Sequence, residues 1–221
     1  MCGRYTLKTP VETLVRRFDL SGPLPGLSPS YNIAPSRKVA AVVLQEGQRR
    51  LEMLRWGLVP SWADDPGIGN RMINARAESV AEKPSYRGAF RSRRCLILAD
   101  GFYEWKRENN GRQPYHIRMR DGSPFAFAGL WESWSGREGE IRSCTIITTD
   151  PNDLLAPIHN RMPVILDPQD YDLWLDISVR DPEVLLPLLA PYEGANLEAY
   201  PVSRLVNSPT NDDPACVEPV G

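Results

Sequence analysis

The sequence predicts an α+β fold: a mainly antiparallel, curled sheet, or pseudo-barrel, with a few short helices. Short β-compatible runs follow one another along most of the chain, and the spacing between them is mostly too short for the crossover helix of a β-α-β unit. The 21 prolines indicate many turns and irregular connections rather than long helices. With no internal repeat and no linker in the 221 residues, one domain spanning residues 1–221 is the simplest organisation.

The first predicted element is a helix that begins after Thr9. Thr9 and Glu12 have the spacing of a capping box, and Pro10 suits the first helical position. Residues 21–30 follow the helix and contain glycine and proline throughout, which indicates a loop. Between the cap and the loop, apolar side chains recur at helical spacing and predict one buried stripe: Val11, Leu14, Val15 and Phe18.

The predicted strands occupy most of the remaining chain. Turn signals separate several of them, near Glu46-Gly47, at Asn109-Asn110-Gly111 and at Asp121-Gly122. Two short helices are expected late, at 168–175 and at 182–189 after an Asp181 cap, and the polar tail 206–214 is either an ordered or a loose wrap. The predicted strands are 38–44, 51–56, 95–98, 102–106, 115–119, 125–130, 143–148 and 162–166.

Charge and hydropathy limit the classes of function. The formal net charge is -2, whereas nucleic-acid binders are usually basic, so such a function would need a local basic groove. No apolar run reaches the roughly 18 residues of a membrane-spanning helix. Charged residues interrupt the apolar runs near the N-terminus, which argues against a signal peptide and for a reducing, cytoplasmic location.

The cysteines point away from a metal site. None of the four lies in a CxxC pair, so neither a zinc site nor a thioredoxin-like motif is expected. Cys95 and Cys144 lie inside apolar runs and are predicted to be small buried hydrophobic residues. Cys2 differs, because removal of Met1 would leave it with a free α-amine beside its thiol. An amine of pKa about 8 is partly neutral near pH 7 and can attack an aldehyde, yet many chains carry a small second residue with no such role.

Three further segments contain residues that could carry chemistry. The segment 73–78 alternates polar residues with alanine, so that Asn74, Arg76 and Glu78 would share one face if it is extended. The guanidinium of Arg76 could then bind a phosphate. A half-exposed strand with no such role explains the pattern as well. Glu104 stands among aromatic residues, so partial burial would raise its pKa toward neutrality, although a surface position fits equally. His159 precedes a strand and could move protons, or serve only as a hydrogen-bonded structural residue, the role we expect for His116.

Taken together, the motifs resemble the SOS response-associated peptidase (SRAP) family. Eight segments match in order and cover nearly the whole chain, which is far more specific than one short motif. Asn207 follows the last of them. The segments are 1–5 (MCGRY), 31–35 (YNIAP), 56–62 (WGLVPSW), 73–78 (INARAE), 94–97 (RCLI), 100–105 (DGFYEW), 158–166 (IHNRMPVIL) and 200–204 (YPVSR).

The resemblance implies a function and a set of site residues. SRAP proteins sense abasic sites in single-stranded DNA and cross-link to them through the N-terminal cysteine. The resemblance implies that Cys2 is the nucleophile once Met1 is removed and that Asn74 holds its amine. It further implies Glu104 as acid and base and His159 as an aid to proton transfer at the sugar. The implied DNA contacts are Arg4, Arg76, Trp62, Trp105, Thr148 and Arg161, with no metal or organic cofactor.

Under this interpretation the cross-link is a thiazolidine that shields the lesion. Stacking on aromatic rings and phosphate contacts would make binding sequence-tolerant and salt-sensitive. We expect a cytoplasmic monomer, nucleoid-associated when bound to DNA. Two alternatives stay open at this point: a cysteine-type autopeptidase acting on its own N-terminus, and a non-covalent single-stranded DNA-binding module in which Cys2 is incidental.

Overall fold

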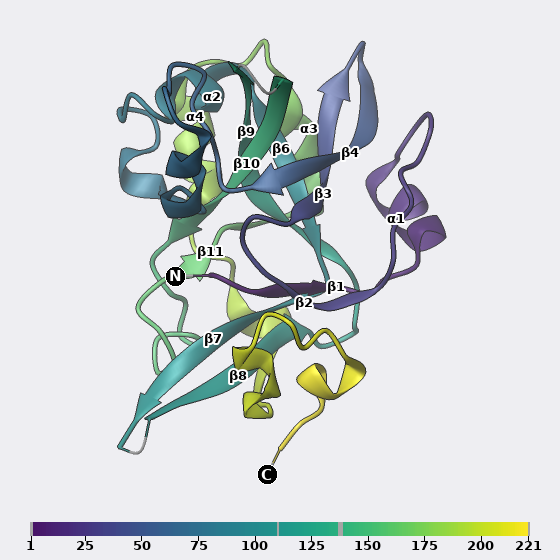
Figure 1. Cartoon of the computed structure of the whole chain (residues 1–221), viewed down its shortest axis with the longest axis vertical. Helices are drawn as coiled ribbons and strands as arrows, with labels where there is room; N and C mark the ends of the chain where they lie inside the picture. Colours follow the sequence, from purple (N-terminus) through teal and green to yellow (C-terminus); the bar gives the residue numbers. More distant parts are fainter. Residues whose placement is uncertain (1, 110, 137–138, 221) are drawn as a thin grey trace.

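A five-stranded barrel forms the centre of the molecule in the computed structural model, which describes residues 2–109, 111–136 and 139–220 (Figure 1). Met1, whose removal is implied above, and Asn110 of the expected turn lie outside the described residues. The barrel closes because β9 pairs with β10 as well as with β6. Its pairs are antiparallel except β10–β4. The barrel strands are β3 (Lys38–Gln45), β4 (Gln48–Trp56), β6 (Arg94–Ala99), β9 (Phe125–Gly136) and β10 (Gly139–Thr149).

Three short strands extend the barrel where it borders the candidate site. β5 pairs in parallel with β10, and β11 pairs antiparallel with the end of the same strand. β12 instead pairs with β9. The end of β10 therefore has β5 on one side and β11 on the other. These strands are β5 (Asn74–Arg76), β11 (Met162–Pro163) and β12 (Ile165–Leu166).

A second, fully antiparallel sheet lies beside the barrel, with strand order β13-β8-β7-β1-β2. Figure 1 shows β7 and β8 as a two-stranded ribbon that extends away from the rest of the molecule. The α+β prediction with a mainly antiparallel, curled sheet is confirmed. The strands of this sheet are β1 (Tyr5–Leu7), β2 (Ser30–Ile33), β7 (Gly101–Glu108), β8 (Gly111–Met119) and β13 (Leu197–Pro201).

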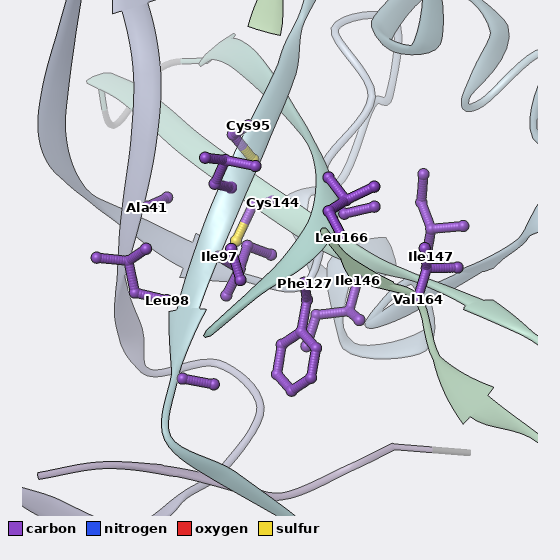
Figure 2. Close-up of a cluster of buried hydrophobic side chains, with 14 of the residues drawn as sticks. Ala41, Cys95, Ile97, Leu98, Phe127, Cys144, Ile146, Ile147, Val164 and Leu166 are labelled. Carbon is purple, nitrogen blue, oxygen red and sulfur yellow. The ribbon is translucent and has the colours of Figure 1, made fainter. Parts of the chain in front are cut away.

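Apolar side chains of the barrel strands form a large buried cluster. Figure 2 shows Phe127 and Ile146 from β9 and β10 among them, with the sulfur atoms of Cys95 and Cys144 in the same cluster. Both cysteines are fully buried, as predicted. Burial raises the pKa of each thiol well above its usual value, so both stay protonated and unreactive.

The helices are short, and one predicted cap is wrong. The first helix starts at Val11, and Thr9 does not cap it: its hydroxyl donates instead to Oδ2 of Asp100 (2.8 Å). Asp100 also accepts the backbone N–H groups of Lys8 and Thr9, so the chain is held by this carboxylate before the helix begins. The late helices form as predicted, and Asp181 accepts a hydrogen bond from the N–H of Glu183. The helices are α1 (Val11–Phe18), α2 (Arg87–Ser92), α3 (Tyr171–Leu175) and α4 (Pro182–Leu185).

Two other predictions need correction or refinement. The segment 73–78 is not extended throughout, because a 3-10 turn (Ala77–Ser79) follows β5; Glu78 therefore leaves the face that holds Asn74 and Arg76. The polar tail is ordered, with 3-10 turns at Arg204–Asn207 and Pro214–Val217. Within the described residues, no helix combines the length and apolar content needed to cross a membrane.

Candidate functional site

Cys2 lies where the two sheets meet. Strand β1 pairs with β7 through Tyr5 and Phe102, and the N–H of Tyr103 donates to the carbonyl oxygen of Arg4 (3.0 Å). This pairing brings the start of the chain alongside the part of β7 that carries Glu104. From the barrel side, Nδ2 of Asn74 donates to the carbonyl oxygen of Cys2 (2.8 Å). The Cys2 side chain is fully buried at this junction.

Glu104 is the buried carboxyl group of the site. It is only 1% exposed, and burial raises its pKa to about 7. At neutral pH such a group divides its time between the acid and the carboxylate, which suits it to give and take a proton. The sequence left open whether Glu104 is buried or on the surface, and the structure places it in the interior.

His159 faces Glu104 from the loop between β10 and β11. Its Nε2 lies 3.8 Å from Oε2 of Glu104, and its Nδ1 lies 3.1 Å from both the backbone nitrogen and the backbone oxygen of Arg161. The ring is thus fixed on one side and directed at the carboxyl group on the other. Burial lowers the pKa of His159, which favours the neutral ring.

The Cys2 thiol is in a poor environment for ionisation. Burial raises its pKa far above the usual value, and the nearby charge of Glu104 adds to the effect. Its Sγ lies 3.9 Å from the carbonyl oxygen of Arg4, an acceptor for the S–H proton. The four central candidates are therefore brought together. Asn74 is hydrogen-bonded to Cys2, Glu104 and His159 are neighbours, and the charge of Glu104 is close enough to raise the pKa of the Cys2 thiol.

The candidate DNA contacts fall into two groups, and the first is open to solvent. Arg76 is exposed at the end of β5 and is two residues from Asn74. Trp62 is 59% exposed, which is unusual for so large an apolar side chain. Trp105 is half-buried, and its indole N–H donates to Oδ1 of Asn207 (2.7 Å). These groups can meet a ligand without breaking internal ion pairs.

The second group is engaged within the protein. Arg161 makes a two-point ion pair with Glu78 and a further bond to Asp150. Thr148 is buried, and its hydroxyl donates to the carbonyl oxygen of Ala75 (3.3 Å). The guanidinium of Arg4 donates to Oδ1 of Asn32 and to the carbonyl oxygens of Val206 and Asn207.

Asn32 is a supporting residue that sequence reasoning did not single out. It is fully buried in β2, and its Nδ2 donates to the carbonyl oxygens of Val206, Ser208 and Asn211. Its Oδ1 accepts from Arg4, so one amide ties the C-terminal segment to the site. The signal that the sequence offered was the position of Asn32 in the matching segment 31–35, since no strand was predicted there.

His116 lies on β8 of the second sheet. His116 is buried away from the site, 3.0 Å from the hydroxyl of Tyr200, and burial lowers its pKa to about 3. That environment is typical of a structural histidine. Among the described residues, no three His, Cys, Asp or Glu side chains gather in a way that could hold a metal ion.

Comparisons with known proteins agree on one family. The family model described as SOS response associated peptidase (SRAP) matches residues 1–209. The chain is 47% identical, over 99% of both sequences, to "Abasic site processing protein YoqW" of Bacillus subtilis (strain 168). It is 35% identical to "Abasic site processing protein HMCES" of Gallus gallus, covering 87% of this chain and 66% of that protein. A solved structure from Bacteroides thetaiotaomicron superposes with a TM-score of 0.89 at 26% identity, covering 99% and 100% of the two chains.

Proposed function

The chain belongs to the SOS response-associated peptidase family, and from this membership and its site we propose that it processes abasic sites in DNA. The proposed reaction joins Cys2, after removal of Met1, to the sugar of an abasic site in single-stranded DNA. The product is a covalent thiazolidine that protects the lesion. The observation that carries the proposal is the hydrogen bond from Asn74 to Cys2 beside the buried Glu104.

The proposed chemistry begins with the amine. The neutral α-amine of Cys2 adds to the aldehyde carbon of the ring-opened sugar and gives a carbinolamine. Loss of water from the carbinolamine gives an imine. The Cys2 sulfur then adds to the imine carbon while the thiol proton passes to nitrogen, which closes the five-membered ring. Atoms and charges balance without an oxidant or a cofactor.

The neighbouring groups fit the proton transfers that this sequence requires. A carboxyl group with a pKa of about 7 can protonate the sugar oxygen to open the ring and can later take a proton back. His159, 3.8 Å from that carboxyl group, can relay the proton. In Asn74, Nδ2 fixes the Cys2 carbonyl, while Oδ1 is buried and finds no hydrogen-bond partner among the described residues. This oxygen is an available acceptor for an N–H of the amine, which would direct its lone pair.

The proposed DNA path uses the exposed groups around the site. Arg76 would bind a phosphate next to the abasic sugar, and Trp62 and Trp105 would stack on neighbouring bases. A missing base lowers the energy needed to draw the sugar out of the stack. Binding to one strand by a monomer, in the cytoplasm and on the nucleoid, remains part of the proposal.

The autopeptidase alternative finds less support in the site. A cysteine peptidase needs a thiolate, which is normally stabilised by a lowered pKa and an adjacent imidazolium. Here burial raises the pKa of the Cys2 thiol, which disfavours the thiolate. The Nε2 atom of His159 faces the carboxyl group of Glu104. The environment therefore favours amine attack first and thiol addition second. A non-covalent DNA-binding module would not require Asn74 to orient the Cys2 backbone, so the hydrogen bond between them favours the covalent reaction.

The test mixes the protein with a single-stranded oligonucleotide that carries one abasic site and resolves the products on a denaturing gel. Intact mass first establishes that Met1 is absent. A covalent band that disappears in Cys2→Ala and persists in Cys144→Ala, a buried cysteine of the barrel core, supports the proposal. No covalent band from protein lacking Met1 would refute it. Cleavage of added peptides without a covalent band would favour the peptidase instead.

A further inference from the structure

Beyond Trp105, the β7–β8 ribbon gathers arginines that no part of the site described so far uses. Arg107 on β7 stands directly opposite Arg112 on β8. Arg204, from the 3-10 turn that packs against β8, places Nη2 3.9 Å from where a Cβ would lie at Gly111. All three arginines are exposed. We refer to Arg107, Arg112 and Arg204 as the arginine arm.

This gathering is unfavourable for the folded chain alone. Like charges at directly opposed positions of an antiparallel pair destabilise the pair. Within the described part of the chain, none of the three guanidinium groups has a hydrogen bond or an ion pair. The nearest acid on the ribbon is Glu108, one residue along β7 from Arg107, so strand alternation turns its side chain to the other face. The three exposed guanidinium groups are therefore available to an anion from outside, such as a phosphate.

The arm continues the candidate DNA path. Alternation along β7 puts Arg107 on the same face as Trp105, whose indole N–H donates to Asn207. Asn207 also accepts from Arg4 through its carbonyl oxygen, so Arg4, Trp105 and the arm form one track. Apart from burial, the positive charge of Arg112 lowers the pKa of His159, which places the arm within electrostatic reach of the site. In Figure 1 the ribbon runs outward from the sheet that it forms with β1 and β2.

We propose that the arginine arm binds backbone phosphates of the DNA strand on one side of the abasic site. The inference rests on the proposed function, because the ligand is the same strand. Arg107 lies two strand positions beyond Trp105 on the same face of β7, about 7 Å along the strand, whereas Glu104 is on the other face. At about 3.4 Å of axial rise per nucleotide of a stacked strand, that length corresponds to roughly two nucleotides beyond the one that Trp105 would contact. The arm thus sets how many flanking nucleotides the protein engages.

The test measures non-covalent affinity for a single-stranded oligonucleotide that carries a tetrahydrofuran analogue of the abasic sugar, which cannot react. One oligonucleotide has about eight nucleotides on each side; two others are cut to a single nucleotide on the 5′ or the 3′ side. The double variant Arg107→Gln/Arg112→Gln is compared with Arg16→Gln/Arg17→Gln. The second pair removes the same charge from α1, on the opposite side of the molecule (Figure 1).

The arm predicts a roughly five- to tenfold loss of affinity for the long oligonucleotide in Arg107→Gln/Arg112→Gln. The slope of log affinity against log salt should fall by about 1.4, because each phosphate contact on a single strand contributes about 0.7. Adding Arg204→Gln should lower the slope by about 0.7 more. One of the two shortened oligonucleotides should show little difference between variant and wild type, and the control pair should show little loss.

Three results would overturn the arm: unchanged affinity, an equal loss in the control pair, or an equal loss with all three oligonucleotides. Thermal unfolding separates binding from folding, since removal of the opposed charges should leave the melting temperature equal or higher. The tetrahydrofuran probe cannot react, so this experiment measures binding alone. If no cross-link forms on a true abasic site, that result contradicts the proposed function, whereas phosphate binding by the arginine arm is still tested by the affinity measurements.

Discussion

The side-chain amide of Asn74 donates a 2.8 Å hydrogen bond to the backbone carbonyl of Cys2, across 72 residues of sequence. Asn74 owes its position to the parallel pairing of β5 with β10, in which it stands opposite Ile146. Fixing the carbonyl of Cys2 also fixes its Cα, and therefore the directions of both the amine and the thiol. After removal of Met1, Cys2 is the first residue and is held by the chain on one side only. The hydrogen bond from Asn74 therefore lets the barrel orient it.

Substitution of Asn74 should separate chemistry from binding. In Asn74→Ala the Cys2 carbonyl loses its donor and the amine loses a candidate acceptor, so the nucleophile is poorly positioned. A misplacement of about 1 Å can lower a rate by roughly a hundredfold, and we expect a slowing of that order in cross-linking. Affinity for the unreactive analogue should change by less than about twofold. The control is Asn70→Ala, which changes an exposed asparagine hydrogen-bonded to Ser36 and Arg55. A loss of affinity in Asn74→Ala as large as its loss of cross-linking rate would contradict the positioning role.

Glu104→Gln should lower the cross-linking rate far more than the affinity. Glutamine keeps the shape of the side chain but cannot transfer a proton, and general acid–base catalysis typically contributes about 10² to 10⁴ in rate. The wild-type rate should change with pH near 7, where burial has moved the pKa of Glu104, and this inflection should be missing in the variant. Rates at saturating DNA across pH 5.5 to about 8.5 provide the measurement. A parallel loss of rate and affinity would point to a structural role.

The same raised pKa makes stability depend on pH with a definite sign. A carboxyl whose pKa is about 7 in the folded state and about 4.5 in the unfolded state binds more protons when folded between these values. Stability contributed by this group is therefore lost as pH rises from about 4.5 to 7, by about 3 kcal/mol at most. Relative to wild type, Glu104→Gln should gain stability between pH 5 and pH 8. Urea unfolding of both proteins at pH 5 and pH 8 measures this gain. If the difference in unfolding free energy between variant and wild type is the same at both pH values, Glu104 is not a buried carboxyl with a raised pKa.

Much of the fold could be predicted because local patterns and tertiary contacts agree. Strands β3 and β4 and their turn at Glu46-Gly47 follow from alternation and turn residues. The cap at Thr9 failed because a distant carboxylate, Asp100, competes for its hydroxyl, and sequence spacing carries no information about such a partner.

The candidate site needed the tertiary structure for a similar reason. Spacing gave no sign that Asn74 would meet Cys2, since strand pairing decides it; only the family resemblance linked them. Pattern alone also could not say that Arg76 is exposed while Arg161 is ion-paired, because both are arginines beside apolar residues.

Arg76 and Arg161 should respond differently to substitution. Arg76 is exposed and available to a phosphate, so Arg76→Ala should weaken binding to single-stranded DNA and lower the salt slope by about 0.7. Arg161 is bonded to Glu78, Asp150 and the carbonyl of Thr148, beside His159. Arg161→Ala should instead disturb the His159 loop and slow cross-linking. Affinity titrations at several salt concentrations distinguish the two. An unchanged salt slope in Arg76→Ala would remove Arg76 from the phosphate contacts.

Arg94 should be among the residues most sensitive to substitution for stability, although it takes no part in the chemistry. The residue is 1% exposed, and its guanidinium donates to five backbone carbonyls, those of Phe90, Arg91, Trp174, Asp176 and Val179. It thereby satisfies the carboxyl-terminal ends of α2 and α3, whose last carbonyl groups have no partner within their own helices.

Burial lowers the pKa of Arg94 to about 10, so the guanidinium remains charged at pH 7. Its hydrogen bonds to the five carbonyl groups replace those that it would make to water. Arg94→Met should lower the free energy of unfolding by about 3–5 kcal/mol, because the carbonyl groups stay buried without donors. Arg94→Lys should restore only part of it, since an ammonium offers three donors in place of five. Urea unfolding at pH 7 is the measurement, with Arg91→Ala, an exposed neighbour in α2, as the control. A loss below about 1 kcal/mol in Arg94→Met would show that water reaches these carbonyl groups and that the arginine is dispensable for joining the two helices.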